Sequence, residues 1–465
     1  MPAKVSNFPI IDPSNGRHVR DHAGIDADEA ARRVSAAHEA WQTWRHTTFA
    51  ERSKVLIAAA AALRSNVDTL ADRCTREMGK PITESRAEIE KCAWVCEYYA
   101  EHAESMLADE VFPIEHAEVR VVRRPIGVLY AVMPWNFPFW QVFRAAAPNL
   151  MAGNAMVLKH APNTMGCGAD ITSILSDAGG PDGLFADLPI DVADSPSVIR
   201  HPSVRGVTLT GSDAAGRAVA SEAGAQLKKC VMELGGSDPY VVLADADIEL
   251  AADRCVSSRM LNCGQVCIAA KRLIVVDAVY DQFEAAVLRR MSAIEMRDPM
   301  DEASTLGPMA REDLRDHLHS QVQRSLAAGA SCLLGGEVPN QAGWWYPPTV
   351  LAGVAPGMPA FDEEMFGPVA CLVQATDADD AIRLADGTSF GLAGAVFTND
   401  AARGTRIACN DIDAGCVAVN DFVRSDPRVP FGGARSSGFG RELGCAGIHE
   451  FVNLKSVVTA ARTDA

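Results

Sequence analysis

The stretch Val207-Thr-Leu-Thr-Gly-Ser-Asp-Ala-Ala-Gly216-Arg217 joins an apolar, β-prone run to a polar segment that contains two glycines. It predicts a strand, a tight turn at Gly211 and the first turn of a helix. Such a turn aims backbone N–H groups and the helix dipole at a phosphate. Since Gly211 and Gly216 alone fall short of a full G-x-G-x-x-G pattern, an ordinary strand-to-helix turn fits equally well.

Outward from this stretch, short runs rich in Val and Ile alternate with helix-like segments. Residues 26–107, before these runs, have the spacing of amphipathic helices, with Asp26 or Asp28 as the first cap. Strands that alternate with helices predict parallel α/β sheets, and we expect two such units with a boundary near Gly235-Gly236. The predicted strands are Val119–Val122, Val128–Met133, Met156–Leu158, Val204–Leu209, Tyr240–Leu243, Arg272–Val276, Ala370–Gln374 and Cys416–Asn420.

Composition excludes several classes of protein. The 43 basic and 60 acidic residues give a net charge of −17 without a basic cluster, so nucleic acid and anionic membranes are not expected partners. The start of the chain has no apolar core of a secretory signal, and the longest apolar run, residues 55–63, is far too short to span a bilayer. The 13 scattered cysteines do not resemble a disulfide framework, so we expect reduced thiols in the cytoplasm.

Three short segments carry candidate chemistry. In Asn262-Cys-Gly-Gln-Val-Cys267, a glycine before the cysteine permits close approach of backbone and ligand, so Cys267 is a candidate nucleophile. In Met232-Glu-Leu-Gly-Gly236, Glu233 is a candidate general base, or equally a capping glutamate. In Pro134-Trp-Asn-Phe-Pro138, Asn136 offers amide donors to an oxyanion, unless the segment is only a structural turn.

Together these motifs resemble the aldehyde dehydrogenase superfamily over essentially the whole chain. The resemblance also includes segments near both ends, all in the family's order. These further segments are Asp12-Pro-Ser-Asn-Gly16, Pro125-Ile-Gly-Val128, Glu363-Glu-Met-Phe-Gly-Pro368, Pro430-Phe-Gly-Gly433 and Ser437-Gly-Phe-Gly-Arg-Glu442. The resemblance implies that Cys267 is the nucleophile, that Glu233 is the general base, and that Asn136 and the Cys267 N–H form the oxyanion hole. A free acid would then be the product, and no metal is expected.

The same resemblance implies an NADP or NAD site. It puts Lys159 on the adenosine ribose, Glu364 with Phe366 around the nicotinamide ribose, and Trp135 in the same cleft. It also puts Gly211, Ser212 and Gly216 near the pyrophosphate. NAD-preferring members often carry a glutamate three residues after the lysine, where this chain has Pro162, so repulsion of a 2′-phosphate is absent and either cofactor is expected.

Within the superfamily, the chain resembles bacterial succinate-semialdehyde dehydrogenases. The segments are Met133 to Gln141, Leu158 to Asn163, Glu233 to Asp238 and Ala269 to Arg272. The resemblance implies that Arg144 and Ser425 bind the far carboxylate of the substrate. Leu261 stands where some members have a second substrate arginine, and Arg259 or Arg424 are candidates to replace it, or else form salt bridges.

The family resemblance also implies a domain plan and an assembly. We expect a Rossmann-like cofactor domain (1–109 and 125–234), an α/β catalytic domain (235–448) and a small β oligomerisation element (110–124 and 449–465). In that element the strands near 110–124 pair with 451–461, and a C-terminal strand added to a neighbour's sheet would make a homodimer or homotetramer.

Competing functions remain at this stage. They are a dehydrogenase for glutarate semialdehyde or an aliphatic aldehyde, a non-catalytic protein on the same fold, and a cofactor-free thiol esterase. Cys263, four residues before Cys267, also suggests a disulfide redox switch, or simply a small buried residue.

Overall fold

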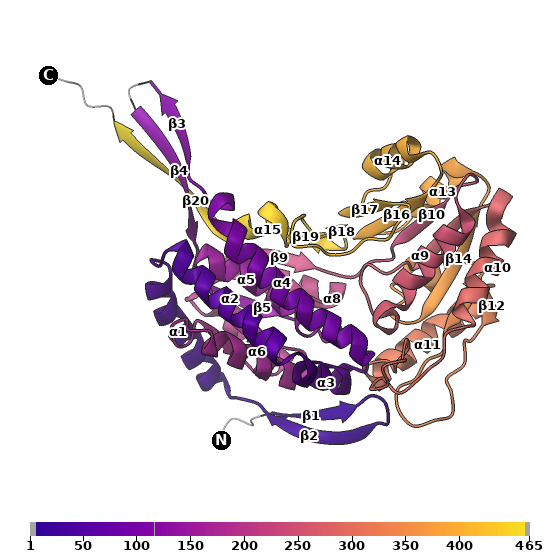
Figure 1. Ribbon diagram of the computed structural model, residues 1–465, viewed down its shortest axis with the longest axis horizontal. Helices are drawn as coiled ribbons and strands as arrows, with labels where there is room; N and C mark the ends of the chain where they lie inside the picture. Colours follow the sequence, from indigo (N-terminus) through magenta and orange to yellow (C-terminus); the bar gives the residue numbers. More distant parts are fainter. Residues whose placement is uncertain (1–5, 116, 461–465) are drawn as a thin grey trace.

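The computed structural model describes residues 6–115 and 117–460, and a six-stranded sheet forms the core of its first half (Figure 1). All strands are parallel except the short edge strand β19. In spatial order they are β19 (Gly438–Phe439), β9 (Lys229–Glu233), β8 (Val204–Thr210), β5 (Val128–Val132), β6 (Ala155–Lys159) and β7 (Phe185–Asp187). From β5 the chain continues to β6 and β7 on one side, and it then returns to β8 and β9 on the other side. The change of direction between β5 and β8 is a topological switch point, where ligands usually bind in such sheets.

Helices cover both faces of this sheet. Right-handed crossovers put α5 (Trp140–Ala152) and α6 (Met165–Asp177) on the face opposite to α7 (Ser195–Arg200) and α8 (Asp213–Ala225). α1 (Ala27–Trp44) lies against β5, β6 and β7 and also contacts α7. An outer layer packs on α5 and α6 and consists of α2 (Phe49–Ser65), α3 (Val67–Met78) and α4 (Ile82–Met106).

The opening helices form where their sequence signals predict. Asp26 caps α1 by accepting a hydrogen bond from the Glu29 N–H at 2.7 Å, and Thr48 with Glu51 forms a capping box for α2. Gly79, with φ of +87°, ends α3. None of the helices within 6–115 and 117–460 is long and apolar enough to cross a membrane.

A seven-stranded sheet forms the second half, and only β12 is antiparallel to its neighbour. Its strands in spatial order are β12 (Ser331–Leu334), β13 (Thr349–Ala352), β14 (Val369–Ala375), β11 (Arg272–Val276), β10 (Pro239–Val242), β16 (Ala393–Phe397) and β17 (Cys416–Val419). Its helices are α9 (Ile248–Met260), α10 (Tyr280–Met291), α11 (Glu312–Ala327), α12 (Pro359–Asp362), α13 (Ala378–Ala385) and α14 (Ala401–Asn410). Separate apolar clusters lie on the two faces of this sheet, so it is covered on both sides.

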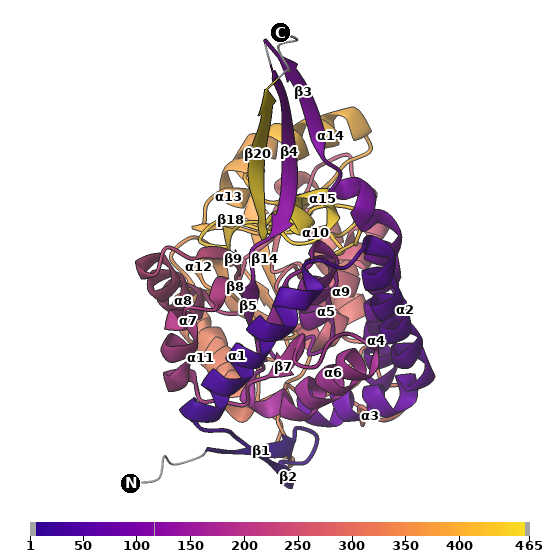
Figure 2. The same cartoon turned by 90° about the vertical axis from the view of Figure 1, so that its left-hand side faces the viewer.

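A three-stranded arm projects from the body and carries the C-terminal strand (Figures 1 and 2). It contains β3 (Glu110–Ile114), β4 (Ala117–Pro125) and β20 (Val452–Ala460), all antiparallel, with Val452 opposite Pro125 and Ala460 opposite Ala117. The expected pairing of these two segments is therefore present. Residues 1–5, 116 and 461–465 of the predicted domains lie outside the described residues.

The mixed α/β class with two parallel sheets confirms the expected fold class, whereas the domain boundaries stay a prediction. β19 falls within the predicted catalytic range 235–448 but pairs with β9 of the first sheet. α15 (Gly444–His449), near the end of the same range, packs on α4 and α5. Two small antiparallel sheets complete the sheets of the described residues: the hairpin of β1 (Asn7–Asp12) with β2 (Arg17–Ala23), and the pair of β15 (Phe390–Gly391) with β18 (Ala434–Arg435), which are distant in sequence.

Candidate active site

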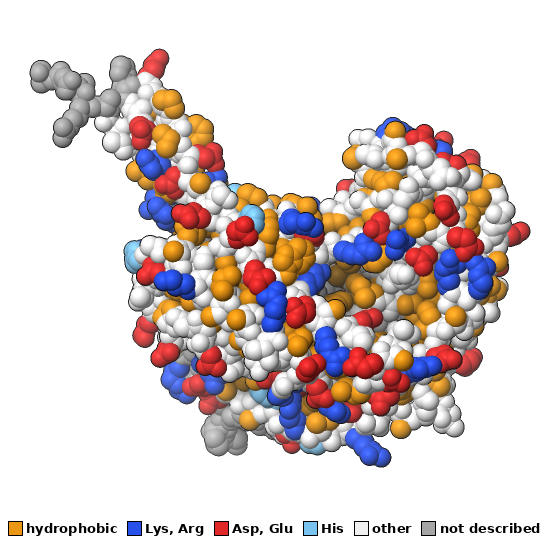
Figure 3. Space-filling model, in the orientation of Figure 1, with side chains coloured by type: hydrophobic (Ala, Val, Ile, Leu, Met, Phe, Trp, Pro, Cys, Tyr) orange, Lys and Arg blue, Asp and Glu red, His pale blue; other side chains and the backbone are white. Residues whose placement is uncertain are grey.

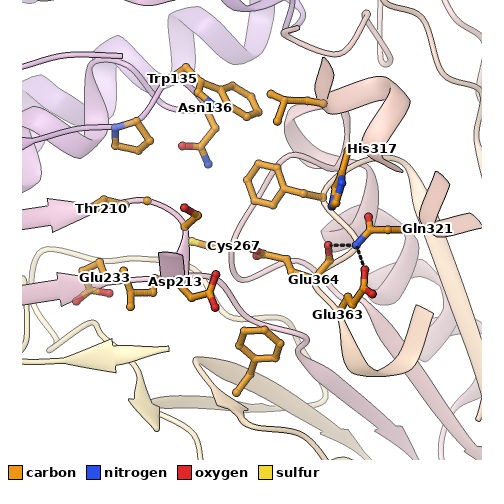
Figure 4. Close-up of a pocket in the computed structure, with 18 of the residues that line it drawn as sticks. Trp135, Asn136, Thr210, Asp213, Glu233, Cys267, His317, Gln321, Glu363 and Glu364 are labelled. Atoms are coloured by element: carbon orange, nitrogen blue, oxygen red, sulfur yellow. Dashed lines mark hydrogen bonds between the residues drawn. The ribbon is translucent and has the colours of Figure 1, made fainter. Parts of the chain in front are cut away.

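A hollow between the two halves of the molecule is visible in the space-filling view (Figure 3). Two cavities share Cys267 in their walls. One, of about 630 Å³, lies against the ends of β5, β8 and β9 and is lined by Trp135, Gly211, Glu233 and Glu364 among others (Figure 4). The other, of about 310 Å³, lies against α4, α5 and the loops beside them, and the loops supply most of its apolar side chains whereas α4 supplies mainly charged ones. A thiol at this junction can be reached from both sides. We refer to these as the cofactor-side and aldehyde-side cavities, after the ligands that the sequence resemblance implies for the residues lining each.

The backbone before Cys267 follows an unusual path. After α9, the segment η3 (Leu261–Gly264) has left-handed conformations at Asn262 and Cys263, with φ of +54° and +56°. At Gly264 a β-carbon would overlap the backbone of Gly367, so only glycine fits. The sequence suggested that this glycine lets a ligand approach, but its close neighbour is the backbone of Gly367.

Asn136 follows β5, and its amide is held in place by hydrogen bonds. Its Nδ2 donates to the backbone carbonyl of Gln265 at 3.0 Å, and Asn262 Nδ2 donates to the backbone carbonyl of Asn136 at 2.8 Å. One hydrogen of the Asn136 Nδ2 remains for another acceptor. Figure 4 shows this amide directed toward Cys267, which is the arrangement that an oxyanion donor requires.

Glu233 ends β9 and is buried, and neither of its carboxylate oxygens has a hydrogen-bond partner among the described residues. Burial raises the pKa of Glu233 well above its usual value, although Arg144 and Arg441 oppose this. Figure 4 shows the carboxylate apart from Cys267. The Glu233 carboxylate can therefore accept a proton, because no hydrogen bond from the described part of the chain occupies its oxygens.

Burial also raises the pKa of the Cys267 thiol, to about 12, and the positive charges of Lys271 and Arg144 oppose this shift. Lys271 is fully buried, donates a hydrogen bond to the Cys267 carbonyl and lies 3.2 Å from Glu364 Oε1. Lys271 lies within the segment Ala269 to Arg272, and no role for it was predicted from the sequence. Lys271 thus contacts both the backbone of Cys267 and Glu364, a residue that lines the cofactor-side cavity.

The predicted cofactor residues are only partly brought together. Trp135, Gly211, Ser212, Glu364 and Phe366 line the cofactor-side cavity, as do Thr210, His317 and Gln321, which the sequence analysis missed. Lys159 and Gly216 are not among its lining residues.

Local contacts explain several of these positions. Glu364 Oε1 accepts a hydrogen bond from the Gly236 N–H at 3.1 Å, and the carboxylate leaves no room for a β-carbon at Gly235. Gly216 instead lets α8 pack on Leu234, 2.5 Å from where its β-carbon would lie. Lys159 is buried beside Asp187 and Asp191, and burial lowers the pKa of its amine.

On the aldehyde side, Arg144 is already engaged. It forms an ion pair with Glu442, donates through Nη2 to Thr210 Oγ1 at 3.2 Å, and lies over the Phe431 ring. Ser425 accepts a hydrogen bond from Lys91 Nζ at 2.8 Å. Lys91, on α4, was absent from the predicted site. No short motif marks it, because 334 residues separate it from Ser425.

The two arginines considered as replacements at Leu261 differ in position. Arg259 is fully buried and donates to the carbonyls of Met365 and Gly264, and it does not line the aldehyde-side cavity. Arg424 does line it, but pairs with Asp421 and lies over the Phe422 ring. Leu261 itself is part of the cavity wall.

Cys263 and Cys267 are both free thiols, and Cys263 Sγ accepts a hydrogen bond from the Gly307 N–H at 3.2 Å. The redox switch stays a hypothesis. Within residues 6–115 and 117–460, no group of three or more His, Cys, Asp or Glu side chains is arranged to hold a metal ion.

The chain is similar to known proteins over almost its whole length. A family model described as "Aldehyde dehydrogenase family" matches residues 1–457. The chain is 47% identical over 449 residues to a succinate semialdehyde dehydrogenase (NAD(P)+) of Escherichia coli K12, covering 96% of each protein. It is 43% identical to a probable succinate-semialdehyde dehydrogenase (NADP+) of Synechocystis, covering 96% of this chain and 98% of the relative.

Solved structures give the same result. The succinic semialdehyde dehydrogenase of Streptococcus pyogenes, solved in complex with NADP+, matches with a TM-score of 0.95 and 33% identity. The match covers 97% of this chain and all of the other.

Proposed function

Because this chain belongs to the aldehyde dehydrogenase family, we propose that it oxidises succinate semialdehyde to succinate, with NADP or NAD as hydride acceptor. The observation that carries the proposal is the meeting of two cavities at Cys267. One has the size and residues for a dinucleotide, and the other has cationic and hydroxyl groups for a small acidic aldehyde. The relatives with this activity named above support the choice of substrate.

The first bond forms between Cys267 and the aldehyde carbon. Since burial holds the pKa of this thiol near 12, the thiol must pass its proton to solvent water as the attack occurs, and the nearby Lys271 favours the thiolate. The carbonyl oxygen becomes an oxyanion that accepts hydrogen bonds from Asn136 Nδ2 and the Cys267 N–H. The cofactor, when bound, supplies a nicotinamide ring that accepts the hydride, which leaves a thioester on Cys267.

Hydrolysis of the thioester is the proposed task of Glu233. Its carboxylate accepts a proton from water, the resulting hydroxide attacks the thioester carbon, and the carbon–sulfur bond breaks to release succinate. The freedom of both oxygens from hydrogen bonds supports this role, because a carboxylate held by structural donors would be a weaker base.

The residues present fit a dinucleotide. Ser212 caps α8, whose N-terminus faces the cofactor-side cavity beside Gly211, and Glu364 brings a carboxylate to the same cavity. Pro162, exposed where NAD-preferring relatives carry glutamate, leaves NADP and NAD both acceptable. Lys159 is the proposed cation for a 2′-phosphate.

The test is a substrate comparison. We expect kcat/KM for succinate semialdehyde to exceed that for butyraldehyde at least tenfold, about 1.4 kcal/mol of transition-state binding, and to exceed that for glutarate semialdehyde. Reduced cofactor at 340 nm would be followed with NAD and with NADP, and Cys267→Ala would serve as the inactive control. Equal rates for butyraldehyde and succinate semialdehyde would leave only a general aldehyde dehydrogenase.

We also propose a homodimer or homotetramer in the cytoplasm. The arm leaves apolar side chains of β3 and β20 exposed, among them Phe112 at 46% and Val458 at 64%. Free edges and exposed apolar strands favour pairing with another copy. All 13 cysteines are free thiols, which fits a reducing compartment.

A further inference from the structure

Lys91 brings a positive charge into the aldehyde-side cavity. It lies on α4 and lines this cavity together with Cys267 and Ser425. Its Nζ donates to Ser425 Oγ at 2.8 Å and lies 4.2 Å from the centre of the Trp140 ring. An ammonium has three hydrogens, so one hydroxyl acceptor leaves Nζ with donors to spare.

The other charged side chains around the cavity already have hydrogen-bond or ion-pair partners. Glu84 accepts a hydrogen bond from the Asn262 N–H at 2.8 Å. Glu88 pairs with Lys80 and accepts from two backbone N–H groups of the α5 entry. Arg144 pairs with Glu442, and Arg424 pairs with Asp421. Among the described residues, Lys91 is the cavity-lining cation that has no carboxylate within 4.0 Å.

An ammonium in such a place is costly unless an anion joins it. The loops that line the cavity are mostly apolar, and the nearby Arg144 charge adds repulsion, which the more distant carboxylates of Asp426 and Glu88 oppose without contacting Nζ. Lys91 is partly buried, and a charge that loses part of its hydration without a counterion beside it is destabilised. A carboxylate bound beside Nζ would supply the missing charge and accept from Ser425 as well, since the two donors are 2.8 Å apart.

We propose that Lys91, together with Ser425, binds the far carboxylate of the substrate and selects acidic aldehydes over neutral ones. This inference rests on the proposed function for the identity of the aldehyde. Position 261, in the segment before Cys267, holds a leucine and brings no positive charge to the cavity. Lys91 would bring that charge from α4. Trp140, under the ammonium, holds Nζ in position by a cation–π contact.

The experiment compares Lys91→Met with the parent enzyme on two aldehydes. We expect kcat/KM for succinate semialdehyde to fall about 10- to 100-fold, with kcat/KM for butyraldehyde unchanged or higher. Lys91→Arg should recover part of the loss. The matched control Lys54→Met removes an exposed lysine of α2 and should change neither value. Equal losses on both aldehydes, or no loss on either, would overturn the proposal.

A binding measurement separates this inference from the proposed function. Succinate should protect Cys267 of the parent enzyme from iodoacetamide, measured by mass spectrometry of the Cys267 peptide, and the protection constant should weaken at least tenfold in Lys91→Met. This readout needs no dehydrogenase activity. If protection weakens while succinate semialdehyde is not the preferred substrate, the proposed function fails and the carboxylate site stands. If protection is the same in both proteins, the Lys91 inference fails whatever the substrate.

Discussion

The thiol of Cys267 lies near the buried ammonium of Lys271, which also pairs with the carboxylate of Glu364. Lys271 contacts the Cys267 carbonyl and the Glu364 carboxylate, so its charge acts on the thiol and on the cofactor-side cavity at the same time. It favours the thiolate against the cost of burial. A neutral side chain of similar length would keep the volume and lose both effects.

We predict that Lys271→Met lowers kcat/KM for all aldehydes about 10- to 100-fold. Its Cys267 thiol should also react with iodoacetamide only at higher pH, because the pKa of the thiol rises without the ammonium. Mass spectrometry of the Cys267 peptide over a pH series checks this shift, and Lys271→Arg should restore the profile. An unchanged alkylation profile would mean that Lys271 only supports the fold.

Lys91 gives the substrate preference a pH dependence. Burial, with the Arg144 charge, lowers the pKa of Lys91 to about 8, while Asp426 and Glu88 oppose the shift. The charged form is therefore lost as the pH rises through about 8. We predict that the ratio of kcat/KM for succinate semialdehyde to that for butyraldehyde falls above pH 8. The ratio cancels the titration of Cys267, and a flat ratio in Lys91→Met is the control.

At the scale of elements, β6 and its following turn depend on His160. This buried ring is 2.8 Å from the Pro138 carbonyl through Nε2, and its Nδ1 accepts from the Ala161 N–H at 2.8 Å. It thus ties the end of β6 to the segment that carries Asn136. These partners require the neutral ring, and burial lowers the pKa of His160 to about 4.

We predict that His160 makes the protein less stable in mild acid. The folded pKa lies below the unfolded value of about 6.5, so the stabilisation is complete above pH 6.5 and is lost as the pH falls toward 4, by about 3 kcal/mol. The thermal midpoint of the parent enzyme should drop more between pH 7 and 5 than that of His160→Gln. Parallel decreases in the two proteins would contradict this.

Local pattern was a good guide to elements with a strong apolar run. β11 has the predicted bounds Arg272–Val276, and the turn at Gly211 joins β8 to α8 as expected. β13 and β16 were missed, because their short buried sequences, TVLA and AGAVF, lack the Val and Ile density of the other strands. The β1–β2 hairpin, which contains Pro9 and several charged residues, gave no strand signal either.

In the candidate site too, some residues could be predicted from the sequence and others could not. Cys267, Asn136 and Glu233 stand in motifs, so the resemblance could find them. The Lys91 to Ser425 contact and the Arg144 to Glu442 pair join segments about 300 residues apart, and no spacing in the sequence encodes them. Only the folded chain shows that Arg144 has a counterion and that Lys91 does not.

At the scale of the whole molecule, the arm is the prominent feature without a partner in the described chain. Leu454 and Val458 lie on one face of β20, and each is 64% exposed. We predict that the double variant Leu454→Asp, Val458→Asp lowers the molar mass measured by light scattering after size exclusion toward that of one chain, because two buried charges cannot be paired across the interface. Lys455→Glu, on the opposite face, is the control that should keep the parent mass.

Glu233 lines the cofactor-side cavity and is absent from the walls of the aldehyde-side cavity. Water that this carboxylate activates would therefore reach Cys267 from the cofactor-side cavity, where Glu364 and Phe366 would hold the nicotinamide ring of a bound cofactor. Because hydrolysis would depend on water entering the same cavity, we expect it to be slower than the oxidation of the aldehyde. A burst of reduced cofactor, equal to the number of active sites, should then precede the steady release of acid.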